Sequence, residues 1–372
     1  MQDNRKFHGS DLELIEAYYH IPKDEIISFS ANVNPLGISS KFRESLVENI
    51  DRVNTYPDRN YSTLRSELGA YCHTLAEHII VGSGATELIS MFIHGIHPQK
   101  SMILNPTYSE YGRELELIGS EVTSFLMDIK QDFRPNIGQL CNALDDSYDL
   151  LILCNPNNPT GTLFYRNDLI LLLEHCKRHH IYIMIDETYV EFVEEVDAIT
   201  AIPLTMQYDD LFVLRGVSKF FAAPGLRFGY GITGSEAILS YIEQVRIPWS
   251  VHALAAYAAG AMFSDVEYIT GTKKFINGER DRLYGILKQE SELYIYKPTA
   301  NFILIRILKE GMTAADFFEH AIREGLLLRD CTSFPGLGSN HIRFCFCHPD
   351  ENDRLVRNIQ ECLGTLKNKH EG

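Results

Sequence analysis

Short, continuous apolar runs recur through the first 220 residues of the chain, each followed by a longer amphipathic segment. The runs are HIIVG (78–82), SMILN (101–105), DLLILCN (149–155), IYIMID (181–186) and LFVLRG (211–216). Strands that are buried on both faces carry such Val-, Ile- and Leu-rich runs, whereas the segments between them have the period of helices. The pattern therefore predicts an α/β fold with a large domain whose mostly parallel central sheet is covered by helices.

The C-terminal part of the chain follows a different pattern. A charged helical stretch is followed by two β-like runs, NFILIRI and HIRFCFC, with a helix between them. This arrangement predicts a second, smaller α+β domain, which the N-terminal residues join. The expected boundaries are 36–263 for the large domain, and 1–35 together with 264–372 for the small domain.

Composition narrows the range of partners. The net charge is −16, whereas nucleic-acid-binding surfaces are built on an excess of Lys and Arg, so we expect no nucleic-acid partner. No apolar run approaches the roughly 20 residues of a membrane span, and the N-terminal segment has no secretory apolar core, so we expect a cytoplasmic protein without a membrane partner. The eight cysteines form no Cys-x-x-Cys pair, and we expect no metal site.

Chemically distinctive residues follow the predicted strands at their carboxyl ends, where open α/β sheets bind ligands. A glycine turn at 82–85 opens a helix and could cradle an anion, although a plain strand-to-helix turn is equally consistent with it. Asp186 ends an all-apolar strand and there needs a cation or a proton donor, unless it caps a helix. Lys219 lies among apolar residues, including Phe220 and Phe221, which is unusual for a lysine.

These features together are more specific than any one of them. Besides Lys219 and Asp186, they include a tyrosine (Tyr189), the amide-rich loop NPNNPTG, and the anion cradle that Ser218 and Arg227 extend. Pyridoxal 5′-phosphate requires such a set: a lysine for the Schiff base, a carboxylate for the pyridine nitrogen, donors for the ring oxygen and an anion site for the phosphate. The sequence therefore predicts a pyridoxal-phosphate enzyme.

Three motifs carry a family resemblance. NPNNPTG, DETY and SKFFAAPGLRFGY occur in this order, with 28 residues from Asn158 to Asp186 and 33 from Asp186 to Lys219. In these motifs the chain resembles the class I/II aminotransferase-like enzymes of fold type I across nearly its whole length. The resemblance implies that Lys219 forms the Schiff base, and it makes Lys219, Asp186 and Tyr189 the catalytic residues.

The same resemblance implies the remaining cofactor contacts and a homodimer with shared active sites. Asp186 would pair with the pyridine nitrogen. The other implied contacts are Asn158 and Tyr189 at the ring oxygen, Tyr108 against the ring face, Ser83, Gly84, Ala85, Ser218 and Arg227 at the phosphate, and Tyr56 from the neighbouring subunit. Gly216 departs from the family pattern, because a hydroxyl residue often stands at this position.

Two further arginines indicate which charged groups the substrate carries. Arg343, in HIRFCFC, stands where the family binds a substrate carboxylate, and Arg329 lies 14 residues earlier, as in histidinol-phosphate aminotransferases. Two arginines favour a small substrate with two anionic groups, such as a phosphorylated amino acid. The alternative for Arg329 is a surface or ion-pairing residue.

The N-terminal segment HGSDLELIEAYYHIPKDEIISFSANVNPLG and the loop around FPGL resemble L-threonine-O-3-phosphate decarboxylases. The resemblance implies decarboxylation of L-threonine O-3-phosphate to (R)-1-amino-2-propanol O-2-phosphate, for cobalamin biosynthesis. The implied substrate-binding residues are His8, Gly9, Asn32, Asn158, Arg329 and Arg343. Asp11 has no evident role in this scheme. The first alternative is a histidinol-phosphate or related aminotransferase, and a second is a protein that keeps the fold but only binds and regulates.

Overall fold

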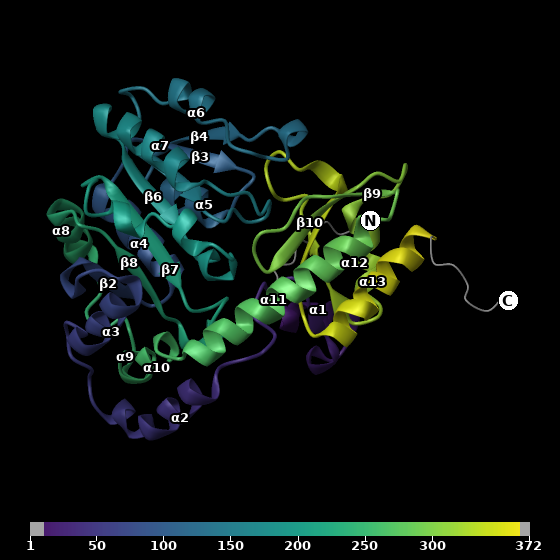
Figure 1. Ribbon diagram of the computed structural model, residues 1–372, viewed down its shortest axis with the longest axis horizontal. Coiled ribbons are helices and arrows are strands. Elements are labelled where there is room, and N and C mark those ends of the chain that lie inside the picture. The colour runs from purple at the N-terminus through teal and green to yellow at the C-terminus, as the bar shows by residue number, and fades with distance from the viewer. Residues whose placement is uncertain (1–10, 365–372) are drawn as a thin grey trace.

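The computed structural model describes residues 11–364, in which a large seven-stranded sheet forms the centre of one part (Figure 1). The spatial order of the strands is β2-β8-β7-β6-β5-β3-β4. Their bounds are β2 (Ile79–Gly82), β3 (Lys100–Asn105), β4 (Glu121–Leu126), β5 (Leu150–Cys154), β6 (Tyr182–Asp186), β7 (Leu211–Gly216) and β8 (Gly229–Ile232). All five runs that the apolar pattern marks are strands of this sheet.

Two strands of the sheet carry weaker signals. β4 is an edge strand with alternately exposed positions, so it lacks the continuous apolar run of its neighbours. β8 is short and rich in glycine, and it pairs antiparallel with both β2 and β7. The pairs from β7 to β4 are parallel, which confirms the prediction of a mostly parallel sheet.

Helices cover both faces of the large sheet, because alternate strand residues point to opposite sides. On one side α4, α5 and α8 pack against residues such as Phe212, whose ring stacks on that of Phe92 with centroids 4.7 Å apart. On the other side α7 packs against residues such as Leu151. The helices are α1 (Leu12–Tyr19), α2 (Ser40–Glu48), α3 (Ser62–Cys72), α4 (Ala85–Ile96), α5 (Glu110–Leu117), α6 (Ile137–Ala143), α7 (Arg166–Arg178), α8 (Glu236–Val245), α9 (Ala253–Ala258), α10 (Gly260–Phe263), α11 (Val266–Leu287), α12 (Ala314–Ile322) and α13 (Pro349–Leu363). Among these described helices, none combines the length and apolar character that a membrane crossing requires.

The smaller part is built on a four-stranded antiparallel sheet in the order β12-β13-β10-β9, and the long helix α11 leads into it from the larger part (Figure 1). Its strands are β9 (Leu293–Ile295), β10 (Phe302–Ile307), β12 (Arg329–Asp330) and β13 (His341–Cys345). The two β-like runs predicted near the C-terminus are β10 and β13, which pair with each other, and the helix between them is α12.

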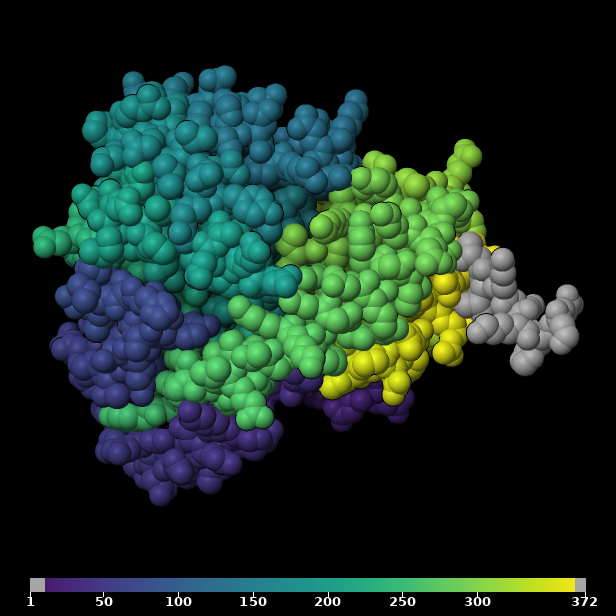
Figure 2. Space-filling model, viewed as in Figure 1, coloured from purple at the N-terminus to yellow at the C-terminus, as the bar shows by residue number. Residues whose placement is uncertain are grey.

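The two ends of the described chain meet in this smaller part. β1 (Ile27–Ser28) pairs in parallel with β11 (Leu326–Leu327). Figure 2 accordingly shows purple N-terminal residues next to yellow C-terminal ones. After β1 the chain passes Lys219, whose carbonyl oxygen accepts a 3.0 Å hydrogen bond from the amide of Asn34. The N-terminal segment therefore forms one wall of the region that contains the predicted site.

Candidate active site

Lys219 lies in the loop after β7, and its amine is held against the N-terminal segment. The Nζ atom donates a hydrogen bond of 2.7 Å to the carbonyl oxygen of Ala31. Burial, followed by the positive charge of Arg343, lowers the pKa of Lys219 to about 8. The ordinary value is 10.5. A much larger share of the amine is therefore neutral near physiological pH, which is the form that attacks an aldehyde.

Asp186 is the last residue of β6, and two donors hold its buried carboxylate. The hydroxyl of Tyr111 donates to Oδ2 at 2.6 Å, and the backbone amide of Thr188 donates to Oδ1 at 2.8 Å. Burial raises the pKa of Asp186, while Thr188, Tyr111 and the charge of Lys219 oppose that rise by favouring the ionised form. The carboxylate is thereby fixed in orientation at the carboxyl end of the sheet.

The turn before α4 lies under the guanidinium of Arg227. Gly84 has a φ of +88°, and a Cβ atom at this position would lie only 2.8 Å from Nη2 of Arg227. Glycine is therefore required here both for the backbone conformation and for the close approach of the cation. Because the N-terminus of α4 and an exposed Arg227 meet at this point, the turn has the charge and the amide donors that an anion such as phosphate needs.

Part of the backbone in this turn already has hydrogen-bond acceptors. The amide of Ser83 donates to Oε2 of Glu87 at 2.6 Å, and the amide of Gly84 donates to the carbonyl oxygen of Gly82 at 2.8 Å. These two amides are therefore not available to an anion. An anion would be bound mainly by the N-terminus of α4 at Ala85 and by Arg227.

Gly216, the departure from the family pattern, lies beside Ala85 and Ser218. A Cβ atom at Gly216 would be 3.7 Å from Cβ of Ala85 and 3.9 Å from Oγ of Ser218, which are ordinary contact distances. The site therefore has room for a small side chain at this position, and one hydroxyl fewer faces the predicted anion site.

Arg343 connects three segments that are far apart in the sequence. Its Nη1 atom donates to Oδ1 of Asn158, and its Nη2 atom donates to the carbonyl oxygen of Ser30 at 2.7 Å. The guanidinium also stands over the ring of Phe302, 5.5 Å from its centroid. The buried Nε atom has no hydrogen-bond partner among residues 11–364. Arg343 is thus fixed in place with one donor still to be satisfied, as a carboxylate site requires.

Tyr189 and Asn32 form a second buried pair in the site. The Nδ2 atom of Asn32 donates to the hydroxyl oxygen of Tyr189 at 3.1 Å, and Nδ2 of Asn301 fixes the carbonyl oxygen of Asn32 at 2.9 Å. The Oδ1 atom of Asn32 is buried without a hydrogen-bond partner in the described part of the chain. Burial raises the pKa of Tyr189, so its phenol is protonated and can donate a hydrogen bond.

Arg329 lies next to Arg343, because the two residues are cross-strand partners in β12 and β13. The Nη2 atom of Arg329 donates to Oγ of Ser333 at 3.0 Å. Burial, followed by the charge of Arg343, lowers the pKa of Arg329, whereas Cys331, Asp330 and, last, Asp11 raise it. The carboxylate of Asp11, for which the sequence suggested no role, is therefore a minor contributor to the charge balance at Arg329.

The remaining predicted residues lie at the edges of the site or beyond it. Tyr108 is half-buried, and its ring packs edge-on against that of Tyr111, with centroids 5.6 Å apart. Tyr56 is 78 % exposed, and its ring lies against that of Trp249, with centroids 5.0 Å apart. His8 and Gly9 fall outside the described residues.

Comparison with known proteins decides the family. Residues 24–359 match the family described as aminotransferase class I and II. The chain belongs to that family. The fold is therefore that of the fold-type I pyridoxal-phosphate enzymes, and the cofactor is pyridoxal 5′-phosphate.

Individual members of the aminotransferase class I and II family match nearly the full chain. The threonine-phosphate decarboxylase of Salmonella typhimurium is 32 % identical over 356 residues, which cover 96 % of both chains. The histidinol-phosphate aminotransferase of Methanococcus aeolicus is 30 % identical over 358 residues and 95 % of both chains. The crystal structure of the histidinol-phosphate aminotransferase from Clostridium acetobutylicum is 30 % identical, with a TM-score of 0.85 over 91 % of this chain and 99 % of that one.

The donors and charges of the site fit the family's cofactor. The close approach of Arg227 to Gly84 forms the cradle that a phosphate needs, and the lowered pKa of Lys219 suits attack on an aldehyde. The buried Asp186 has the charge that a pyridinium nitrogen requires. The geometry therefore brings together every predicted residue of the described chain except Tyr56.

Tyr111 and two backbone carbonyl groups were not singled out from the sequence. Tyr111 is fully buried at the start of α5, where the sequence shows only an aromatic residue in a helical segment. The carbonyl oxygens of Ser30 and Ala31 accept from Arg343 and Lys219, and a backbone acceptor leaves no mark in a sequence.

Proposed function

We propose that this family member is a decarboxylase that converts L-threonine O-3-phosphate to (R)-1-amino-2-propanol O-2-phosphate, for use in cobalamin biosynthesis. The adjacent guanidinium groups of Arg343 and Arg329 carry this proposal, because two fixed cations suit a substrate with a carboxylate and a phosphate. Support also comes from the decarboxylase relative and from the segment that contains Asn32, which lies in the site.

In this proposal the chain's own residues bind the substrate and hold its reacting bond. The unpartnered Nε of Arg343 and the Oδ1 of Asn32 face polar groups of the substrate, and Arg329 binds its phosphate. Because both anionic ends are fixed, rotation about the bond between Cα and the amino nitrogen is restricted. Held in this way, the substrate would present its bond from Cα to the carboxylate for cleavage, and CO₂ would leave.

Asp186 and Lys219 have the electrostatic and proton-transfer roles in this proposal. Pyridoxal 5′-phosphate, when bound, supplies an aldehyde for the amine and a pyridinium ring that accepts the electron pair left on Cα. Asp186 holds the proton on the ring nitrogen, since its carboxylate is buried and oriented by Tyr111. The Nζ atom of Lys219 holds the cofactor between turnovers and then delivers a proton to Cα, which completes the amine product.

The test is a product assay with two substrates. The purified enzyme is incubated with O-phospho-L-threonine without any keto acid, and CO₂ and the amine are measured. We expect stoichiometric release of both, and a loss of most of the rate with plain threonine, because the remote phosphate positions the reacting bond. Rapid conversion of histidinol phosphate with 2-oxoglutarate, without turnover of phosphothreonine, would contradict the proposal.

The second candidate is a histidinol-phosphate aminotransferase. It is favoured by the relatives of that name, which match the chain at similar identity, and it would use the same cofactor residues. In that case the bound substrate would present its Cα–H bond to Lys219, whose Nζ atom would remove that proton. The product assay separates the two functions, because only transamination requires the keto acid.

We also propose that the enzyme is a homodimer in which Tyr56 reaches the phosphate site of the partner. Support comes from the exposure of Tyr56 and Trp249 together with nearby apolar side chains, since exposed apolar patches mark interfaces. Mixing Lys219→Ala chains with Tyr56→Ala chains tests this. A shared site predicts that mixed dimers regain activity, to about a quarter of wild type in a random mixture, because one of their two sites is intact. No gain on mixing, or an active monomer in sedimentation, would contradict it.

A further inference from the structure

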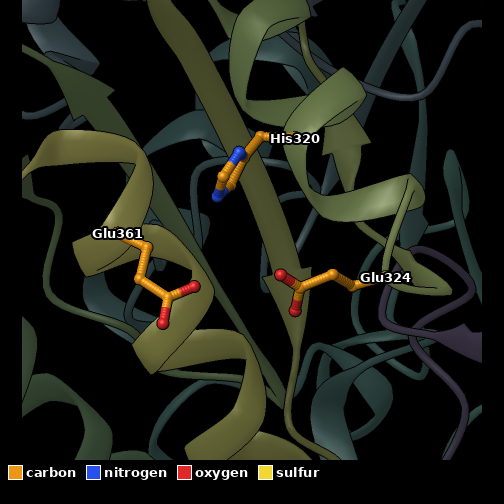
Figure 3. A group of neighbouring side chains, drawn as sticks. All are labelled: His320, Glu324 and Glu361. Carbon is orange, nitrogen blue, oxygen red and sulfur yellow. The ribbon is translucent and has the colours of Figure 1, made fainter.

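A group of side chains remote from Lys219 has the composition of a metal site. His320 lies in the last turn of α12, Glu324 follows that helix, and Glu361 lies in the last turn of α13. A ring nitrogen of His320 and one carboxylate oxygen from each glutamate all lie within 4.8 Å of one another. Figure 3 shows the imidazole of His320 extending toward the space between the two carboxyl groups.

The backbone explains why these side chains meet. His320 and Glu324 are four residues apart, and helical hydrogen bonds continue past α12, from the amide of Glu324 to the carbonyl oxygen of Ala321. Residues at this spacing share one face of a helix. α12 packs against α13, and Nη2 of Arg354 on α13 donates to the carbonyl oxygen of Glu324 at 3.3 Å. Two ligands on one helix and a third on its neighbour are thus held in place by the packing.

The three side chains have unused ligand atoms. The Nε2 atom of His320 is buried and has no hydrogen-bond partner in the part of the chain that the structure describes. Within residues 11–364, neither Glu324 nor Glu361 forms a side-chain ion pair. A buried nitrogen normally has a partner, and two exposed carboxylates beside it favour a cation in that role.

We propose that His320, Glu324 and Glu361 bind a divalent transition-metal ion, with Zn²⁺ as the ion that the donor set fits best. One imidazole and two carboxylates are common zinc ligands, and three protein ligands leave a position for water. Around a tetrahedral ion with bonds of about 2.1 Å the ligand atoms would be about 3.4 Å apart. The two exposed glutamate side chains can rotate to make this contraction, while the helix packing keeps His320 in place. The ion would clamp α12 to α13.

The experiment uses the cofactor-loaded enzyme after removal of metals with EDTA. Calorimetric titration with ZnCl₂ is expected to show one ion per chain, and the melting temperature should rise with the Zn²⁺ concentration. Glu324→Gln, Glu361→Gln and His320→Asn should each weaken binding at least about tenfold, since each removes a ligand. The two glutamates are exposed, so their variants test the proposal even if His320→Asn is unstable.

Two control variants exclude other zinc-binding groups. His175 lies in the last turn of α7 and His179 directly follows that helix, and Nδ1 of His179 contacts Asp146, so His179→Asn reports on that group. Cys362→Ser reports on the thiol next to Glu361. Both variants should bind Zn²⁺ as the wild type does, with an unchanged cofactor absorption spectrum. Loss of binding in either control, or wild-type binding by both glutamate variants, would overturn the proposal.

Discussion

The hydroxyl of Tyr111 donates a 2.6 Å hydrogen bond to Oδ2 of Asp186 in a region where both residues are buried. The backbone amide of Thr188 donates to Oδ1 of Asp186, and the side chains of Thr188 and Tyr111 both lower its pKa. Tyr111 is therefore one side chain through which the charge of Asp186 can be adjusted without changing Asp186 itself.

Replacing Tyr111 with phenylalanine should lower kcat/KM by roughly 10- to 150-fold, because a hydrogen bond to a charged group contributes about 1.5–3 kcal/mol. Without its donor the buried carboxylate has a higher pKa, so it stabilises the ring-nitrogen proton less well. Steady-state kinetics and a pH titration of the cofactor's absorption measure both effects. Tyr148→Phe removes the hydroxyl of a buried tyrosine elsewhere and should change neither. An unchanged titration in Tyr111→Phe would show that the hydrogen bond has no electronic role.

Asp186→Asn should lower kcat by at least about 100-fold, on the scale of other preorganised charges in active sites. The amide keeps the shape of the carboxylate but cannot hold a proton on the ring nitrogen as a negative charge does. Single-turnover kinetics on the cofactor-loaded variant separate this effect from weaker cofactor binding. Near-normal turnover would mean that another group protonates the ring nitrogen.

The pKa of Lys219 predicts how cofactor loading depends on pH. Only the neutral amine attacks the aldehyde, so the loading rate of the cofactor-free protein should rise with pH, with a midpoint near 8 instead of the ordinary 10.5. Removing the nearby cation in Arg343→Gln should move the midpoint upward. Stopped-flow absorption measures the rate. Borohydride should fix the cofactor at Lys219 and not in Lys219→Ala, and a fixed cofactor at another lysine would contradict the assignment.

Gly216→Ser should tighten the binding of pyridoxal 5′-phosphate by about 2- to 10-fold, because one added hydrogen bond contributes about 0.5–1.5 kcal/mol. The site has room for the new side chain beside Ala85 and Ser218. Gly229→Ser is the matched control, since a Cβ atom there would lie 2.9 Å from the amide nitrogen of Ala85 and must disturb the turn. Equilibrium dialysis of the two variants should therefore give changes in opposite directions.

The features that the sequence predicts are those that can be recognised within one local segment, without knowledge of its neighbours in the fold. Continuous apolar runs identify five strands of the large sheet, and Asp186 and Lys219 stand out because each places a polar group where apolar residues dominate. The sequence does not predict β4 or β8, because neither contains a continuous apolar run. β4 is a partly exposed edge strand, and β8 is rich in glycine. Tyr111 resembles any core aromatic until its contact with Asp186 is known.

The pairing of β1 with β11 has a consequence for synthesis on the ribosome. Ile27 emerges early, but its strand partner Leu326 is translated nearly 300 residues later, roughly 15–60 s afterwards at ordinary elongation rates. Until then the segment that contacts Lys219 and Arg343 has no sheet to join, although all seven strands of the large sheet are complete by Ile232. A nascent chain would thus complete the loop that contains Lys219 long before the N-terminal segment can take its place beside that loop.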